Sequence, residues 1–106
     1  MKAVMLISVL SLSLGVAYAA GDATAGKAVY DRACKTCHGA MGEGNPNIAK
    51  AMKVEVADLR SPEVQKMSDD DLKKAVTDGK GKMQPVRSVT GKSVDDVVAF
   101  LRTLKK

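Results

Sequence analysis

Aromatic residues are scarce in this sequence, which has one Phe, two Tyr and no Trp among its 106 residues. Tyr18 lies in the apolar N-terminal segment, so Tyr30 and Phe100 are the aromatic residues left for a folded core. Aromatic side chains contribute much of the apolar area that a core buries, and short chains often rely on a disulfide, metal or cofactor. We therefore expect something other than side chains to fill the centre of this fold.

Histidine and cysteine are also few, since His38 is the single histidine and Cys34 and Cys37 are the two cysteines. A structural zinc site usually takes four ligands, so a Cys/His site would be one ligand short. A thioredoxin-like dithiol needs a βαβ setting, and the sequence shows no convincing strand pattern. A disulfide between the two cysteines is compatible with an exported chain, but it leaves His38 without a role.

The charge balance is basic, with a formal net charge of +5. The lysines are scattered, however, and no aromatic residues accompany them as a platform for stacking bases. We therefore expect no nucleic-acid binding. A solvated basic surface that meets acidic patches on partner proteins is the better interpretation.

The chain begins MKAVMLISVLSLSLGVAYAA, in which Lys2 precedes an apolar run and Ala17-Tyr18-Ala19 has the small-x-small pattern of a cleavage site. This pattern predicts a secretory signal peptide over residues 1–19, a single domain over residues 20–106 and a periplasmic protein without a membrane span. Removal of 19 of the 106 residues leaves 87, and the loss of Lys2 lowers the net charge to +4. The alternative is an uncleaved membrane anchor, because residues 3–20 are uncharged and approach the ~20 residues of a span.

The domain is expected to be all-α, with helices separated by loops rich in Gly, Pro and Asn. One helix is predicted from Ala23 to Thr36 after Asp22 as N-cap, and an irregular loop is predicted at residues 45–47.

Three further helix starts are predicted at Ser61, Ser68 and Ser93, and the helix that begins at Ser68 should stop at Asp78-Gly79. The last helix has a one-sided apolar stripe, which consists of Val94, Val97, Val98, Leu101 and Leu104.

The stretch Ala33-Cys34-Lys35-Thr36-Cys37-His38-Gly39 contains the pattern C-x-x-C-H, which is the attachment signal for c-type haem. Near the end of a helix the two thiols lie on one side, where each can form a thioether with a haem vinyl group. His38 can then reach the iron from the proximal face. The sequence therefore predicts one covalently bound haem c, held by Cys34 and Cys37 and ligated by His38.

Three segments of the chain resemble the class I (monohaem) c-type cytochromes. They are GKAVYDRACKTCHGAMGEGNPNIAKAM for the N-terminal part, DLKKAVTDGKGKMQPV for the region of the sixth iron ligand, and VVAFLRTL for the C-terminal helix. The resemblance covers residues 21–106. It implies a small cytochrome c-like fold of about four short helices and loops around one haem.

Methionine is the natural second iron ligand in a chain with a single histidine. Met83 is the candidate, because it lies in a loop with Gly79, Gly81 and Pro85 that resembles the ligand loop of the family, although Gln84 stands where many members have Pro. We expect the remaining methionines to be structural: Met41 is too close to His38, Met67 precedes a helix cap, and Met52 should pack in an apolar patch.

The resemblance also implies two structural roles. The carbonyl of Pro46 is the expected hydrogen-bond acceptor for the second ring nitrogen of His38. The first and last helices should cross at a small residue with aromatic packing, and the matching residues are Gly26, Tyr30, Val97 and Phe100.

These observations predict a soluble electron carrier rather than an enzyme, in which the iron cycles between Fe(II) and Fe(III) with His38 and Met83 as ligands. Its partners would be transient redox donors and acceptors with acidic patches. The lysines expected to meet them are Lys27, Lys35, Lys80, Lys82 and Lys92. The alternative is a haem enzyme or gas sensor with an open or displaceable sixth ligand.

Overall fold

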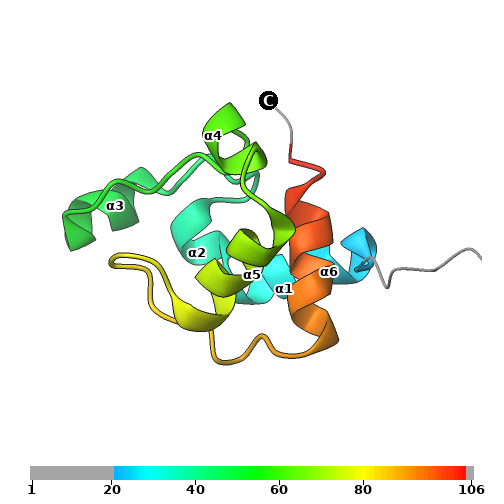
Figure 1. Cartoon of the computed structure of the whole chain (residues 1–106). Helices are drawn as coiled ribbons and strands as arrows, with labels where there is room; N and C mark the ends of the chain where they lie inside the picture. Colours follow the sequence, from blue (N-terminus) through cyan, green and yellow to red (C-terminus); the bar gives the residue numbers. More distant parts are fainter. Residues whose placement is uncertain (1–20, 105–106) are drawn as a thin grey trace, which may run out of the picture.

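The computed structural model describes residues 21–104, which form an all-helical domain (Figure 1). The helices are α1 (Ala23–Ala33), α2 (Lys35–His38), α3 (Pro46–Met52), α4 (Pro62–Gln65), α5 (Asp69–Asp78) and α6 (Lys92–Leu101). Among the described residues, β-type pairing is limited to one isolated antiparallel bridge between Lys80 and Met83. The predicted fold class is confirmed. The predicted signal peptide, its cleavage after Ala19 and the first residue left, Ala20, lie outside the described residues.

Three of the predicted N-caps are confirmed by hydrogen bonds from backbone N–H groups to the capping side chains. The carboxylate of Asp22 accepts bonds from the first turn of α1 at 2.8 and 3.3 Å. The hydroxyls of Ser61 and Ser68 accept bonds from α4 and α5 at 3.3 and 3.1 Å. Because these caps satisfy N–H groups that a helix cannot satisfy itself, they fix where each helix begins. Helix α5 ends at Asp78, followed by Gly79, as predicted.

The prediction that Ser93 caps the last helix is wrong. The N-cap lies two residues earlier, at Gly91, which has a φ of 57° and a ψ of −131°, so α6 begins at Lys92. Glycine adopts this left-handed φ at little cost, so the turn is made by Gly91 and Ser93 falls inside the first helical turn.

Two predicted boundaries near the middle of the chain are also wrong. The first helix ends at Ala33 rather than Thr36, because Cys34, with φ −122° and ψ −32°, leaves helical geometry before α2 begins. The residues predicted as an irregular loop start a helix instead. The side chain of Asn45 caps α3, and Pro46 is its first residue, a position that suits the fixed φ of proline.

The core is organised around the crossing of α1 and α6. A Cβ atom on Gly26 would overlap the carbonyl oxygen of Asp96, so the two backbones touch at this point. Next to the crossing, the rings of Tyr30 and Phe100 pack with centroids 5.0 Å apart and planes inclined by 50°. Tyr30 and Val97 have no solvent-exposed area. The crossing implied by the family resemblance is therefore present.

The apolar stripe of α6 and its continuation face this core. All five residues predicted for the stripe are buried, and the remaining buried apolar residues come from α1, α4, α5, the segment before α6 and α6 itself. These further residues are Val29, Tyr30, Val64, Leu72, Val76, Val89 and Phe100.

A buried carboxylate fixes the start of α1 onto α6. Asp96 is 6% exposed and accepts a hydrogen bond of 2.7 Å from the backbone N–H of Asp22 and one of 3.3 Å from Lys92. The N–H of Asp22, and then the ammonium of Lys92, hold the pKa of the Asp96 carboxyl below its usual value. Asp96 therefore stays ionised at neutral pH and ties residue 22 to the last helix.

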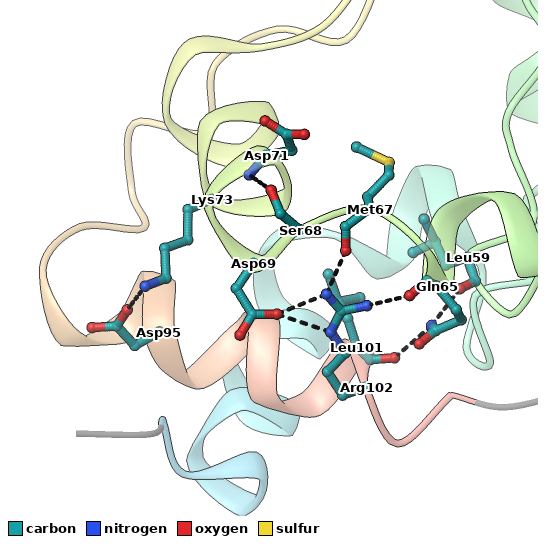
Figure 2. Close-up of polar contacts among 10 residues, drawn as sticks. All are labelled: Leu59, Gln65, Met67, Ser68, Asp69, Asp71, Lys73, Asp95, Leu101 and Arg102. Atoms are coloured by element: carbon teal, nitrogen blue, oxygen red, sulfur yellow. Dashed lines mark hydrogen bonds and ion pairs between the residues drawn. The ribbon is translucent and has the colours of Figure 1, made fainter. Parts of the chain in front are cut away.

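The segment from α4 to α5 is held against α6 by Gln65 and Arg102 (Figure 2). The side-chain amide of Gln65 donates to the carbonyls of Leu59 and Leu101 at 2.8 and 3.0 Å. The guanidinium of Arg102 donates to the carbonyls of Gln65 and Met67 at 2.8 and 2.6 Å, and to the carboxylate of Asp69. These bonds satisfy backbone carbonyls in residues 59–67, where α4 is a single helical turn.

No helix in the described part of the chain is both long enough and apolar enough to cross a bilayer.

The crossing at Gly26 predicts the sign of a stability change. Helix propensity alone would make Gly26→Ala stabilising by about 1 kcal/mol. Because the added methyl group meets backbone rather than a movable side chain, we expect a net loss of roughly 1–3 kcal/mol in the free energy of unfolding. Urea unfolding of the purified protein measures this, with Ala28→Ser at an exposed position of α1 as control. A variant as stable as wild type, or more stable, would show that the helices do not touch at Gly26.

Candidate functional site

The three residues of the C-x-x-C-H motif lie on one turn of helix. Cys34 is the C-cap of α1 and the N-cap of α2, and its carbonyl accepts hydrogen bonds from the N–H groups of Cys37 and His38 at 3.3 and 3.0 Å. Residues three apart on a helical turn are neighbours on its surface, so the two thiols project from one side. The structure therefore brings Cys34, Cys37 and His38 together, as the sequence predicted.

The two thiols are free and differ in their surroundings. Cys37 is exposed, whereas Cys34 is half-buried and packs against the hydrophobic core. Burial, and to a smaller extent the neighbouring Cys37, raises the pKa of the Cys34 thiol to about 11. At neutral pH, Cys34 is therefore a neutral thiol beside the core.

The imidazole of His38 is held in its neutral form, because burial lowers its pKa. Its Nδ1 atom is buried and finds no hydrogen-bond partner among the described residues. A neutral imidazole is the form that binds a metal, and a buried ring nitrogen without a partner is costly unless something else satisfies it.

The expected bond from His38 to the Pro46 carbonyl is absent from this structure, in which Nδ1 is unpaired. Pro46 is the first residue of α3. Helical carbonyls point along their own axis toward N–H groups one turn ahead, which directs the Pro46 carbonyl along α3 rather than toward the histidine.

The other predicted ligand, Met83, lies in a tight, closed loop after α5. Lys80 and Met83 exchange two backbone hydrogen bonds of 3.0 and 2.9 Å. Gly81 has a φ of 58° at the first central position, as in a type II′ turn. Gly79 has a φ of 79°, and a Cβ atom there would overlap the carbonyl oxygen of Met83. Both glycines are therefore needed to place Met83, which is half-buried.

A further bond fastens this loop to α5, because the N–H of Val86 donates to the carbonyl of Val76 at 2.8 Å. In the view of Figure 1, the loop (yellow) and α3 (green) project toward the same side of the molecule, beyond α2. Met83 thus belongs to a second, separately fixed segment of the candidate site, while the motif residues share one turn.

The other three methionines have different surroundings. Met67 is half-buried against the core, and Met41 is 59% exposed. The expectation that Met52 packs in an apolar patch is wrong, because it is 48% exposed. Met52 is the last residue of α3, a short helix in which no residue is buried, so the structure gives it no apolar surface to cover it.

Sequence reasoning missed two side chains that contact the motif turn. The amide of Asn45 donates to the carbonyl of Thr36 at 3.0 Å, and the hydroxyl of Tyr30 donates to the carbonyl of Gly39 at 2.6 Å. The one signal for Asn45 was its position before Pro46, since Asn followed by Pro suits a helix start. The hydroxyl of Tyr30 had no signal beyond the packing expected of its ring.

The donor set fits a covalently attached haem. Cys34 and Cys37 supply free thiols on one side of a turn, and His38 supplies a neutral, half-buried imidazole with a buried, unpaired ring nitrogen. Within residues 21–104, no three Cys, His, Asp or Glu side chains gather into a group that could hold a metal ion. These residues therefore present no ligand set for the zinc alternative.

Comparison with known proteins agrees with this chemistry. Residues 21–101 match the family described as cytochrome c oxidase, cbb3-type, subunit III. A solved structure described as KustC0563 c-type cytochrome is similar to the chain with a TM-score of 0.64 and 26% identity, over 76% of this chain and 98% of that one. No curated protein matches. The chain belongs to the class I c-type cytochromes, the haem-binding electron carriers.

Proposed function

We propose that the protein is a monohaem electron carrier that takes one electron from a donor protein and gives it to an acceptor. The observation that supports this most strongly is the motif turn itself, where two free thiols lie beside a neutral, half-buried His38 whose buried Nδ1 has no partner among the described residues. Haem bound there would supply a reversible Fe(II)/Fe(III) couple.

Each residue of the site has a distinct role in this proposal. Cys34 and Cys37 hold the haem through thioether bonds, which keep it attached when the fold opens. His38 and Met83 would ligate the iron, and a thioether ligand together with an imidazole would favour the reduced state and raise the potential.

Electron transfer is helped by ligands that move little when the iron changes charge. His38 is the last residue of α2, and both of its backbone groups are bonded, at 3.0 Å to Cys34 and at 2.7 Å to Gly44. Met83 lies in a loop closed by the bonds to Lys80. Both ligand-bearing segments are thus held by backbone hydrogen bonds that do not depend on the oxidation state.

Three of the lysines predicted to meet a partner flank the two ligand segments. Lys35 belongs to α2, next to Cys34, and Lys80 and Lys82 belong to the Met83 loop. All three are exposed and, within the described residues, none forms an ion pair. They support a basic docking surface around the site, which acidic redox partners would recognise transiently.

The other two predicted lysines are less suited to that role. Lys27 pairs with Asp31 at 2.8 Å and Lys92 pairs with Asp96 at 3.3 Å. Their charges are partly balanced within the molecule, so we assign docking to the unpaired group, Lys35, Lys80 and Lys82.

The proposed location is the bacterial periplasm, after export and cleavage behind Ala19. The N-terminal segment has the pattern of a signal peptide, and covalent haem attachment takes place outside the bacterial cytoplasm. The mature chain would then have a net charge of +4.

The first prediction concerns attachment. Acid-acetone treatment of the exported wild-type protein should leave one haem with the polypeptide. Cys34→Ala and Cys37→Ala each remove one thioether, so part of the haem should become extractable, and the double variant should lose all of it. Thr36→Ala, between the two cysteines, is the matched control and should keep its haem. Free haem from the wild type, or one equivalent of zinc without iron, would rule out this proposal.

The second prediction concerns the sixth ligand. The ferric protein should show the weak sulfur-to-iron charge-transfer band at the red end of the visible spectrum. Met83→Ala should abolish this band, lower the potential and let the reduced iron bind carbon monoxide. Met52→Ala and Met67→Ala should keep the band, although Met67→Ala should cost about 2 kcal/mol or more in packing. Rapid carbon monoxide binding by the wild type would favour the haem enzyme or gas sensor with an open sixth site.

The third prediction concerns recognition. The second-order rate of electron transfer with an acidic redox protein should fall as salt rises, because charges are screened over ~8 Å at physiological ionic strength. Lys35→Gln and Lys82→Gln should weaken the salt dependence more than Lys27→Gln, whose charge is already balanced by Asp31. Equal effects of the three variants would mean that the unpaired lysines have no special role in docking.

A further inference from the structure

The last carbonyls of the motif turn, those of residues 36–39, all accept hydrogen bonds from outside α2. A helix leaves its last four carbonyls without internal partners, and α2 has only four residues, Lys35–His38. Here the carbonyls of residues 36–39 all accept hydrogen bonds from elsewhere. The donors are Asn45 Nδ2 to Thr36 at 3.0 Å, the Asn45 N–H to Cys37 at 2.9 Å, the Gly44 N–H to His38 at 2.7 Å, and the Tyr30 hydroxyl to Gly39 at 2.6 Å.

Asn45 uses both ends of its side-chain amide. Its Oδ1 accepts from the N–H groups of Asn47 and Ile48 at 3.0 and 3.4 Å, which caps α3, while its Nδ2 donates to Thr36. Aspartate or serine could cap α3 equally well, but aspartate has no side-chain donor and serine is too short to serve both ends. The donor to the motif turn therefore depends on the amide.

Tyr30 connects the same turn to the centre of the fold. Its ring has no exposed area and packs against Phe100, and its hydroxyl reaches the carbonyl of Gly39, the residue after His38. Burial, and then the nearby thiol of Cys34, raises the pKa of the Tyr30 hydroxyl, so it remains protonated and able to donate. Phenylalanine would preserve the packing and lose only this bond.

We infer that Asn45 and Tyr30 are positioning residues that hold the haem-attachment turn in its binding geometry. Their bonds fix the peptide groups on both sides of Cys37 and His38, and hence the directions in which the thiol and the imidazole leave the backbone. This inference rests on the proposed haem function. Neither side chain needs to touch the haem, because each acts through the backbone of α2.

The test uses the exported holoprotein and variants that remove one donor each. Asn45→Ser and Asn45→Asp both keep the cap of α3 and lose the donor to Thr36, so a shared effect comes from the lost donor rather than from the added charge. Tyr30→Phe loses the donor to Gly39. Ser68→Ala removes a cap of α5 without touching α2 and serves as the matched control for a general loss of stability.

Two measurements separate positioning from stability. Hydrogen exchange should be at least 10-fold faster at the backbone amides of residues 38, 39 and 45 in the donor variants, with α6 unchanged. The haem resonances of the ferric protein, which would report the orientation of the ligating imidazole, should shift in the same variants. Ser68→Ala should change neither the α2 amides nor the resonances.

The outcomes are distinguishable. Exchange rates and resonances like those of wild type in Asn45→Ser and Tyr30→Phe would overturn the inference, as would equal changes in Ser68→Ala. A loss of haem protein in the donor variants alongside a normal yield of Ser68→Ala would support it. A wild-type protein without covalent haem would instead overturn the proposed function on which the inference rests.

Discussion

The backbone contact between α1 and α6 at Gly26 is the constraint on which the rest of the molecule depends. It brings the first helix directly onto the last and encloses Tyr30 next to Phe100. From there the hydroxyl of Tyr30 reaches the end of the motif turn, so the helix crossing and the candidate haem site are joined by one hydrogen bond. The carboxylate of Asp96 reinforces the same contact by binding the start of α1. The crossing of the first and last helices thus supports one end of the attachment turn.

The part of the molecule around α3 and His38 is packed less completely. Helix α3 buries none of its residues, Met41 and Met52 are exposed, and His38 has an unpaired ring nitrogen. Such features cost free energy in a core packed by side chains alone, since apolar groups are stabilised by burial and buried polar atoms need hydrogen-bond partners. They are consistent with a protein that completes its interior with a large cofactor, as the scarcity of aromatic residues suggested.

Much of this could be predicted from the sequence, because the signals were local. The caps at Asp22, Ser61 and Ser68, the apolar stripe of α6 and the haem motif each depend on residues a few positions apart. Local signals failed where the backbone adopts a conformation that the neighbouring residue types do not indicate. Gly91 rather than Ser93 is the N-cap of α6, Cys34 interrupts the first helix, and α3 begins inside a stretch that looks like a loop.

Long-range contacts could not be predicted from the sequence. The bonds that Gln65 and Arg102 make between α4, α5 and α6 join residues more than 30 positions apart, and no spacing rule predicts them. The two donors that reach the motif turn, Asn45 and Tyr30, each act over nine positions. The exposure of Met52 likewise depends on what α3 lacks as a neighbour, which its apolar composition could not reveal.

The central claim is that the protein exchanges single electrons without changing its fold. A potentiometric titration of the exported protein, followed by its absorption spectrum and by circular dichroism, tests this most directly. We expect one reversible wave with the slope of a one-electron couple, full recovery on reoxidation, and the same helical signal in both states. An absent or irreversible wave, a two-electron slope, or a helical signal that changes with oxidation state would contradict the account.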